Sequence, residues 1–316
     1  MVGKDVDFAA DLLRSSKLVG MPTETVYGLA ANALDPRAVA TIFEVKQRPS
    51  FDPLIIHVDE WEKLDGLVEK VPSVLRQKLE HFVPGPLTFL LPRTSAIPDI
   101  VTAGLPEVAI RMPRHPMARR LLSKLDFPLA APSANPFGYI SPTQPSHVVD
   151  QLGSKIPYVL DGGPCQVGIE STIIRWTPDN ALQVLRKGGL ALEKLKEIFG
   201  DLDVFQHSTS NPKAPGMLKS HYAPKTPFLL GDIEQLVSEH QSKKIAFLGF
   251  DQSTDLLPKS QQFLLSAEGD LSEAAAGLFA QMRALDQMGF DIIIASPFPE
   301  RGLGRAINDR LKRAAN

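Results

Sequence analysis

The chain has 316 residues, of which 43% are hydrophobic and 22% charged, and its formal net charge is -2. This length predicts two domains, or one large domain with an appendage. The near-neutral charge excludes a basic surface over the whole molecule, so a phosphate-binding surface must be local. The single cysteine, Cys165, excludes an intramolecular disulfide and a zinc site of clustered cysteines, and because neither a secretory signal nor an apolar run of ~20 residues is visible, we expect a cytoplasmic protein.

The first predicted elements enclose a turn rich in hydroxyl groups. Apolar residues at helical spacing predict a helix over residues 7–18, and a short strand then leads into the segment Pro22-Thr-Glu-Thr-Val-Tyr-Gly28. Thr23 and Thr25 flank a carboxylate there. The alternative is that Thr-Glu-Thr begins a helix capped by Thr23, and the local chemistry favours neither.

A second helix has clear boundaries. Asp35 followed by Pro36 is typical of an N-cap with proline at the first helical position, and apolar residues follow at helical spacing. The helix must end near Pro49, because proline disfavours helical geometry in the residue before it. Pro53 then opens a run over residues 54–58 that predicts a buried strand.

Two cations follow this helix directly. Lys46 and Arg48 lie on the short connection between helix and strand, and His57 lies on the strand. Arginine can hold phosphate oxygens with two parallel hydrogen bonds while lysine supplies a point charge, so the connection is suited to a polyanion. Taken alone, however, a Lys-x-Arg pair at a helix end more often complements the helix dipole.

The middle of the chain alternates helices and strands. Helices are predicted at 73–82, 117–125 and 145–152, and strands at 87–91, 108–111, 127–131, 158–160, 173–176 and 183–185. Arg111 leaves the end of one strand, and ligands in open α/β sheets bind at strand ends. Ser133 and Asn135 lie two apart between prolines, so in an extended backbone both could donate to one ligand; a self-capped turn is the alternative. Arg186 enters a glycine-rich exit that can approach phosphate or be a plain surface loop.

The last third of the chain predicts a linker and a smaller unit. Residues 202–227 are poor in apolar residues and rich in proline and serine, which is typical of a linker. Strands at 228–230, 245–250 and 291–295, with helices at 232–239, 271–285 and 301–315, predict a small three-layer α/β unit.

Several segments together resemble a known family. They are Pro22-Thr-Glu-Thr-Val-Tyr-Gly-Leu29, Lys46-Gln-Arg48-Pro with Pro53-Leu-Ile-Ile-His57, Pro84-Gly-Pro-Leu-Thr88, Ile110-Arg-Met-Pro113, Pro132-Ser-Ala-Asn135 and Arg186-Lys-Gly-Gly189. In this order they resemble the YrdC-like family. The linker segment His221-Tyr222-Ala-Pro and the terminal Gly302-Leu-Gly-Arg-Ala-Ile-Asn-Asp-Arg-Leu311 are similar to its two-domain threonylcarbamoyl-AMP synthases.

The resemblance implies a fold and an activity. The fold would be α/β, with a twisted mixed sheet around a large basic cavity in residues 1–201, a linker folded over the cavity in 202–227, and a smaller Rossmann-like α/β domain in 228–316. The activity would be that of a nucleotidyltransferase, which condenses L-threonine, bicarbonate and ATP into threonylcarbamoyl-AMP and pyrophosphate. The product would pass to a tRNA threonylcarbamoyltransferase that modifies adenosine 37, so tRNA would be met only indirectly and no membrane is involved.

The resemblance also implies residue roles. Lys46 and Arg48 would be catalytic, and the residues around ATP would be Lys46, Arg48, Ser50, Ser133, Asn135, Ser141, Arg186 and Tyr222. Threonine would be held by Thr23, His57, Arg111 and Ser171. Mg²⁺ would arrive with ATP, with no metal site built by the protein, and Lys46 and Arg48 would face solvent in the cavity.

Two other functions remain open at this stage. Carbamoyl transfer in hydrogenase maturation uses a related domain, but in longer chains with cysteine-rich zinc fingers, and Cys165 alone argues against it. A non-catalytic RNA-binding or ribosome-associated module could use a basic cavity for a phosphate backbone. Dependence on threonine separates synthesis from RNA binding.

Overall fold

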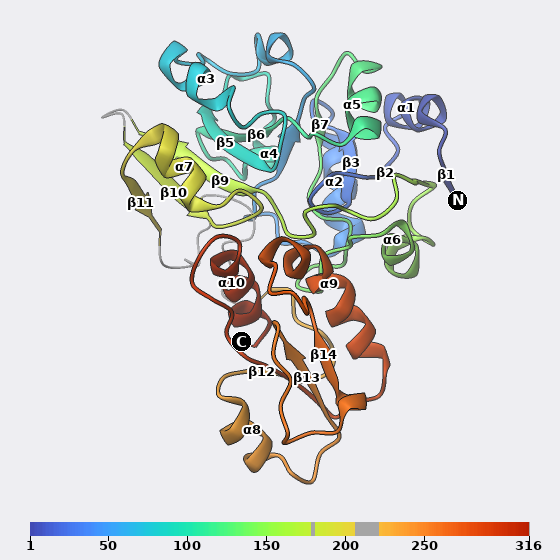
Figure 1. The fold of residues 1–316 in the computed structure, drawn as a ribbon. Coiled ribbons are helices and arrows are strands. Elements are labelled where there is room, and N and C mark those ends of the chain that lie inside the picture. Colours follow the sequence, from blue (N-terminus) through green and yellow to red (C-terminus); the bar gives the residue numbers. More distant parts are fainter. Residues whose placement is uncertain (178–180, 206–220, 316) are drawn as a thin grey trace.

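Two α/β units make up the molecule (Figure 1). The computed structural model describes residues 1–177, 181–205 and 221–315. The strands of the first unit are β1 (Val2–Gly3), β2 (Val19–Met21), β3 (Gly28–Asn32), β4 (Ile55–His57), β5 (Leu87–Pro92), β6 (Glu107–Arg111), β7 (Leu129–Ala130), β8 (Tyr158–Leu160), β9 (Thr172–Trp176), β10 (Leu182–Arg186) and β11 (Leu202–Val204). Its helices are α1 (Val6–Arg14), α2 (Pro36–Lys46), α3 (Ser73–Leu79), α4 (Asp99–Thr102), α5 (Pro116–Ser123), α6 (Pro145–Leu152) and α7 (Leu192–Phe199).

In the described part of the first unit, eleven strands form one mixed sheet. Their order is β1-β8-β2-β3-β7-β4-β6-β5-β9-β10-β11, with parallel and antiparallel neighbours. The predicted large mixed sheet is therefore confirmed. Strands β2 and β3 pair as antiparallel neighbours from Val19↔Ala30 to Met21↔Gly28, so the Thr-Glu-Thr segment is the turn between them and begins no helix.

Helix α2 begins and ends where the sequence predicts. The side chain of Asp35 accepts a hydrogen bond from the amide of Arg37, and Pro36 occupies the first helical position. Gln47 then takes the left-handed conformation at φ 53°, which stops the helix and turns the chain toward β4.

Helices cover the two faces of this sheet unequally. Helices α1 and α5 pack on one face, where Leu13 and Leu121 meet Met21 of β2, and the remaining helices pack mainly on the other. Further along the first face a separate small cluster gathers Ile55, Leu90, Ala109, Ile173 and Leu185, all from strands, with Phe205 against it. No helix residue belongs to this cluster in the described chain, although all five strand residues are buried.

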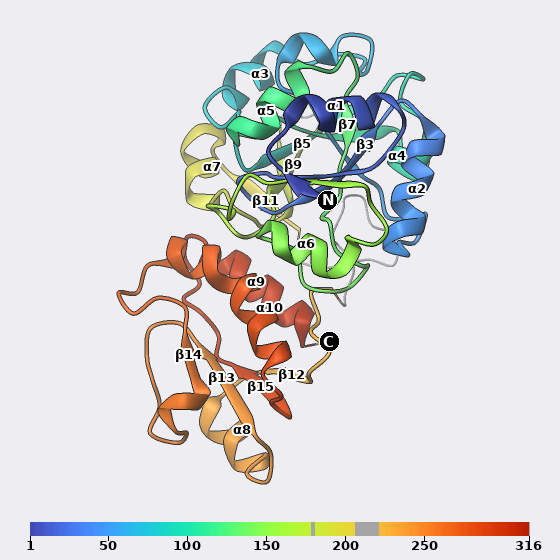
Figure 2. The same cartoon turned by 90° about the vertical axis from the view of Figure 1, so that its right-hand side faces the viewer.

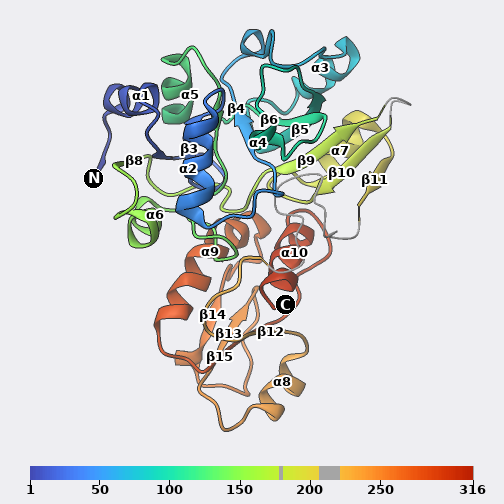
Figure 3. The same ribbon diagram turned by 180° about the vertical axis from the view of Figure 1, so that it is seen from behind.

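The second unit has the predicted three layers. It consists of β12 (Phe228–Leu230), α8 (Ile233–Glu239), β13 (Ile245–Gly249), β14 (Gln262–Leu264), α9 (Leu271–Gln287), β15 (Ile292–Ala295) and α10 (Gly304–Ala314). Four parallel strands are ordered β12-β15-β13-β14. Along β15, Ile292 and Ile294 pack toward α8, whereas Ile293 and Ala295 pack toward α9 and α10. Figures 2 and 3 show α9 and α10 between this sheet and the first unit.

Some elements lie where the sequence predicts none. Helix α7 and strand β11 continue the first unit, and β11 pairs in parallel with β10 although it falls within the predicted linker 202–227. Strand β14 was missed because it is a short edge strand whose residues are partly exposed. The remainder of the predicted linker over 206–220 lies outside the described residues. No helix in the described chain is both long and apolar enough to cross a membrane.

We predict that Ile110→Ala lowers the free energy of unfolding by about 2–5 kcal/mol. The side chain is fully buried in β6, in the middle of the large sheet, so its removal leaves a cavity that the neighbouring strands cannot close. Val74→Ala on α3 is the control, because Val74 is 57% exposed and its truncation should change stability by no more than about 0.5 kcal/mol. Urea unfolding measures both, and equal effects would contradict this description of the core.

Candidate active site

A pocket lies against the helix-free part of the sheet. Its walls come from the β2–β3 turn, β4, the end of β6, the segment after β7, the segment before β9, the end of β10 and the start of the second unit. The lining residues are Thr25, Val26, Arg48, Ile55, His57, Arg111, Ala131, Pro132, Ser133, Glu170, Ser171, Arg186, His221 and Tyr222.

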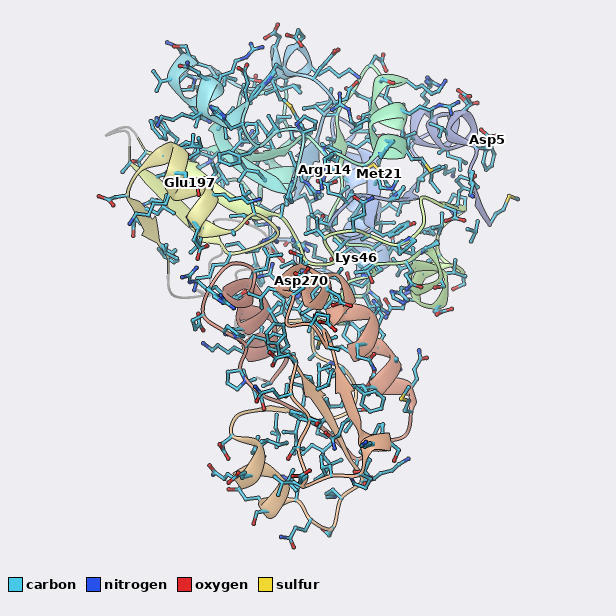
Figure 4. All side chains as sticks on the ribbon, in the orientation of Figure 1. Asp5, Met21, Lys46, Arg114, Glu197 and Asp270 are labelled. Atoms are coloured by element: carbon cyan, nitrogen blue, oxygen red, sulfur yellow. The ribbon has the colours of Figure 1, made fainter. Side chains whose placement is uncertain are left out.

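The Lys-x-Arg pair is buried, so the expectation that both side chains face solvent is wrong. Lys46 is 1% exposed, and its ammonium donates to the carbonyl oxygens of Ser133 and Asn135. Burial, together with the nearby Arg48 charge, holds the pKa of Lys46 well below its ordinary value. Lys46 continues the buried face of α2 with Val39, Ile42 and Phe43, and Figure 4 places it on the side of the first unit that faces the second.

Arg48, unlike Lys46, lines the pocket. Its guanidinium forms a buried ion pair of 2.9 Å with Asp52 and donates to the carbonyl oxygen of Pro53 at 2.9 Å. The carboxylate four residues onward thus neutralises the arginine and fixes its direction. Ser50, in the same loop, is exposed and does not line the pocket.

Arg111 ends β6 as predicted and points into the pocket wall. It forms a 2.8 Å ion pair with Glu24 and donates to the Thr25 hydroxyl at 2.7 Å. Burial raises the pKa of the Glu24 carboxyl, but Arg111 outweighs this effect and the net shift is downward, so Glu24 is ionised. The Thr23 hydroxyl is used inside the turn, where it accepts from the amides of Thr25 and Val26, and Thr25 lines the pocket in its place.

His57 presents a neutral ring to the pocket. Its side chain is buried, and Nδ1 has no hydrogen-bond partner among the described residues. Burial, reinforced by the charge of Arg111, lowers the pKa of His57 to about 3. An unpartnered buried nitrogen costs free energy, so His57 is ready to bond a polar ligand.

Ser133 and Asn135 do not act as a matched pair. Ser133 lines the pocket, whereas the Asn135 amide donates to the carbonyl oxygens of Pro136 at 2.9 Å and Tyr139 at 2.8 Å. Both Asn135 donors are therefore occupied, and the expectation that the two residues donate to one ligand is not met. Asn135 instead shapes the loop that Lys46 holds.

Glu170, Ser171 and Arg186 form the opposite wall. Arg186 donates from Nε to the Ser171 carbonyl and from Nη2 to the Ser171 hydroxyl, both at 3.1 Å, and burial lowers its pKa to about 10. A Cβ at Gly188 would lie 2.3 Å from the carbonyl oxygen of Glu170. The glycine-rich exit therefore permits close backbone packing behind this wall. Ser141 lies outside the pocket lining, where its hydroxyl donates to Glu170 at 2.5 Å.

The start of the second unit closes the pocket. Tyr222, at φ 67°, stacks on Phe279 of α9 with ring centroids 5.3 Å apart, and burial raises its pKa to about 12. His221 packs edge-on against Phe137 at 5.8 Å, and burial lowers its pKa to about 3. Two residues of the predicted linker, His221 and Tyr222, therefore line the pocket, and the covering role of the linker stays a prediction.

The predicted site residues thus fall into two groups. Those that line the pocket are Arg48, His57, Arg111, Ser133, Ser171, Arg186 and Tyr222, and those that lie behind or outside it are Lys46, Thr23, Asn135, Ser141 and Ser50. The prediction missed Thr25, Glu170 and His221 as lining residues. The sequence did carry a signal for all three, because each adjoins a predicted site residue or belongs to a quoted motif.

A metal ion would find few free ligands here. The described residues contain no group of three or more His, Cys, Asp or Glu side chains that could hold one. Glu170 in the pocket lining, and Glu24 and Asp52 behind it, each pair with an arginine. The donor set therefore fits Mg²⁺ only as an ion that enters on the phosphates of a ligand.

Known protein families match nearly the whole length of this chain. A family model for Sua5, YciO and YrdC, described as "Telomere recombination", matches residues 11–188, and a model described as "Threonylcarbamoyl-AMP synthase, C-terminal domain" matches residues 190–316. The chain is 39% identical to a threonylcarbamoyl-AMP synthase of Pyrococcus abyssi, over 98% of this chain and 94% of the relative. A Bacillus subtilis protein of the same name is 38% identical over 97% and 92%.

Solved structures agree with these relatives. The crystal structure of P. abyssi Sua5 complexed with L-threonine has a TM-score of 0.92 and 37% identity, covering 100% of this chain and 97% of that one. A HypF structure in the phosphate- and nucleotide-bound form matches 58% of this chain with a TM-score of 0.53 and 19% identity, which is a likeness of fold alone.

We predict that the buried His57 makes stability depend on pH. Its pKa is about 3 in the folded protein and 6.5 ordinarily, so between these values the unfolded chain binds a proton that the folded protein does not. The free energy of unfolding therefore falls as the pH drops through this window, by about 1.4 kcal/mol per pH unit from this group. Denaturant unfolding of the wild type and His57→Gln at pH 8 and pH 5 measures the effect. The wild type should lose more stability than the variant, and parallel losses would contradict a neutral buried His57.

Proposed function

The chain belongs to the Sua5/YciO/YrdC family, and we propose that it synthesises L-threonylcarbamoyl-AMP from L-threonine, bicarbonate and ATP with release of pyrophosphate. One observation carries this proposal: Arg48, Arg111 and Arg186, from three separate elements, converge on one small-molecule pocket that also holds a neutral histidine. A pocket with several guanidinium groups suits an amino acid carboxylate together with a triphosphate.

The threonine end of the pocket is assigned to the wall around Arg111. Arg111 takes the carboxylate, since Glu24 fixes its guanidinium without removing it from the pocket. His57 and Ser171 bond the amine and hydroxyl, and Thr23 holds the turn that presents Thr25. The relative from P. abyssi, of similar structure, was crystallised with L-threonine.

The nucleotide end is assigned to Arg48, Arg186, Ser133 and Tyr222, which line the same pocket. Lys46 and Asn135 support this end from behind, because Lys46 ties the 133–135 loop to the end of α2. Ser50 and Ser141 complete the set at its margin. Mg²⁺, when it arrives with ATP, would supply positive charge between the phosphate oxygens.

The chemistry needs placement and charge neutralisation. Bicarbonate takes up a proton and loses water to give carbon dioxide, and the unprotonated amine of threonine adds to this carbon dioxide and releases a proton, which leaves a carbamate and one water. A carbamate oxygen then attacks the α-phosphorus as the bond to pyrophosphate breaks. Arg48 and Arg186 neutralise the charge that accumulates on the phosphates, and Arg111 holds the attacking molecule in line. Tyr222 and His221 exclude water, which protects a labile carbamate. No covalent intermediate on the protein is required.

The charges in and behind the pocket support the finer prediction of a basic cavity. Lys46, Arg48, Arg111, Arg186 and Arg310 outnumber the buried carboxylates Glu24, Asp52 and Glu170, although the whole chain has a net charge of -2. Arg310 also pairs with the less buried Asp309 at 3.0 Å. These cations are enclosed, so a phosphate backbone of RNA could not reach them, and the chain favours a small substrate over the RNA-binding alternative. We further propose that the parallel second unit is Rossmann-like, that the enzyme is cytoplasmic, and that its product goes to a tRNA threonylcarbamoyltransferase.

We predict that the protein releases pyrophosphate from ATP only when L-threonine and bicarbonate are both present. A coupled pyrophosphate assay measures this, with each substrate omitted in turn. Arg48→Met and Lys46→Met should lower kcat/KM by about a hundredfold or more, because each removes a preorganised charge or its support from the phosphate end.

The control for these variants is Arg76→Met. Arg76 is a half-exposed arginine over Trp61, outside the pocket, so this change should leave kcat/KM within about twofold. Pyrophosphate release that ignores threonine, or salt-sensitive RNA binding in its place, would reject the synthase assignment.

A further inference from the structure

Arg310 of helix α10 reaches out of the second unit into the wall of the pocket. It is fully buried, and its Nε donates to Oε2 of Glu170 at 3.0 Å while Nη1 donates to the carbonyl oxygen of Lys187 at 2.6 Å. Oε1 of Glu170 accepts from the Ser141 hydroxyl at 2.5 Å. Both oxygens of a pocket-lining carboxylate are therefore engaged, one of them by the second unit.

The Glu170 carboxylate lies in a pocket where a negative charge is unfavourable. Glu170 lines a pocket assigned to an anionic substrate, and its neighbour Ser171 is held by Arg186. Burial raises the pKa of Glu170, but Arg310 and then Arg186 outweigh it, so the group stays ionised. An ionised carboxylate beside bound phosphates repels them unless a cation compensates it.

Arg310 also contacts the residue that closes the pocket. Its guanidinium lies 5.4 Å from the ring centroid of Tyr222, on a ring that stacks on Phe279. One side chain thus touches both the Glu170 wall and the Tyr222 cover. Displacement of Arg310 would disturb both.

We propose that Arg310 is a positioning residue for the nucleotide: it compensates Glu170 and holds it away from Arg186, so that the arginine remains directed at the anionic substrate. Without Arg310, the nearest cation for Glu170 is Arg186, and this pairing would withdraw Arg186 from the phosphates. The second unit is then part of the nucleotide site as well as its cover. The inference rests on the proposed function for the identity of the anion, ATP.

The same helix offers a matched control. Arg305 of α10 forms an ion pair of 2.5 Å with Glu193 of α7, which also joins the two units. The two side chains are 29% and 47% exposed, and neither lines the pocket. Arg305→Met removes an inter-unit ion pair without touching Glu170.

The test is the dissociation constant of ATP, measured by calorimetry on the full chain. Arg310→Met should weaken binding by about tenfold or more, since it leaves a buried charge uncompensated, whereas Arg305→Met should stay within about twofold of the wild type. The double variant Glu170→Gln with Arg310→Met should recover to within about threefold of the wild type, because the repelling charge is gone. A purely structural role for Arg310 would not be rescued in this way.

Two outcomes would overturn the proposal: equal losses in Arg310→Met and Arg305→Met, or a double variant as weak as Arg310→Met alone. Thermal unfolding verifies that each variant is folded. If Arg310→Met does not fold, the ATP dissociation constants of Glu170→Gln and of the double variant are compared instead. Without the Glu170 charge, the loss of Arg310 should weaken ATP binding by less than about threefold. ATP binding is measured without turnover, so the two proposals can fail separately. If the variants show the expected order of ATP affinities but the wild type makes no pyrophosphate, the synthase assignment is rejected and this inference stands.

Discussion

The burial of charge is the constraint on which this structure depends. A guanidinium taken out of water must be compensated, and the pocket holds several of them close together. Each compensating carboxylate comes from a different part of the chain: Asp52 lies four residues beyond Arg48, Glu24 comes from a distant turn, and Glu170 meets an arginine of the second unit. The site can form only when these separate segments have come together, so the charged pocket exists only in the folded chain.

The sequence predicts best what is decided locally. Asp35, Pro36 and Pro49 fix the ends of α2 through capping and proline geometry, and the structure has that helix where these residues require it. The three layers of the second unit follow in the same way from the continuous apolar run of β15, whose buried residues pack alternately on its two faces. Strand β14 escaped prediction because an edge strand is stabilised by one neighbour and carries little apolar pattern of its own.

At the candidate site, the sequence predicted residue types better than side-chain directions. The residue types of the pocket were predicted from quoted motifs, but the direction of each side chain was not. Lys46 falls at the helical spacing of Val39, Ile42 and Phe43 on the buried face of α2, so its inward direction follows from the period of the helix. Asn135 gives both its donors to nearby carbonyls, because the 133–141 loop closes on itself. That direction depends on contacts across the fold, as does the choice of Thr25 over Thr23, and neither spacing nor propensity encodes them.

The second unit is built into the rear of the pocket. Val26, Ile140 and Ile169 of the first unit share one apolar cluster with α9 and α10, so separation of the units would expose this surface. Gly168, at φ 73°, lies so close to α9 that a Cβ there would approach the backbone of Ala276 to 2.4 Å. The segment that carries Glu170 and Ser171 is thereby held in place by the second unit on one side and by Arg186 on the other. A pocket wall supported from both sides keeps its charged side chains in fixed directions.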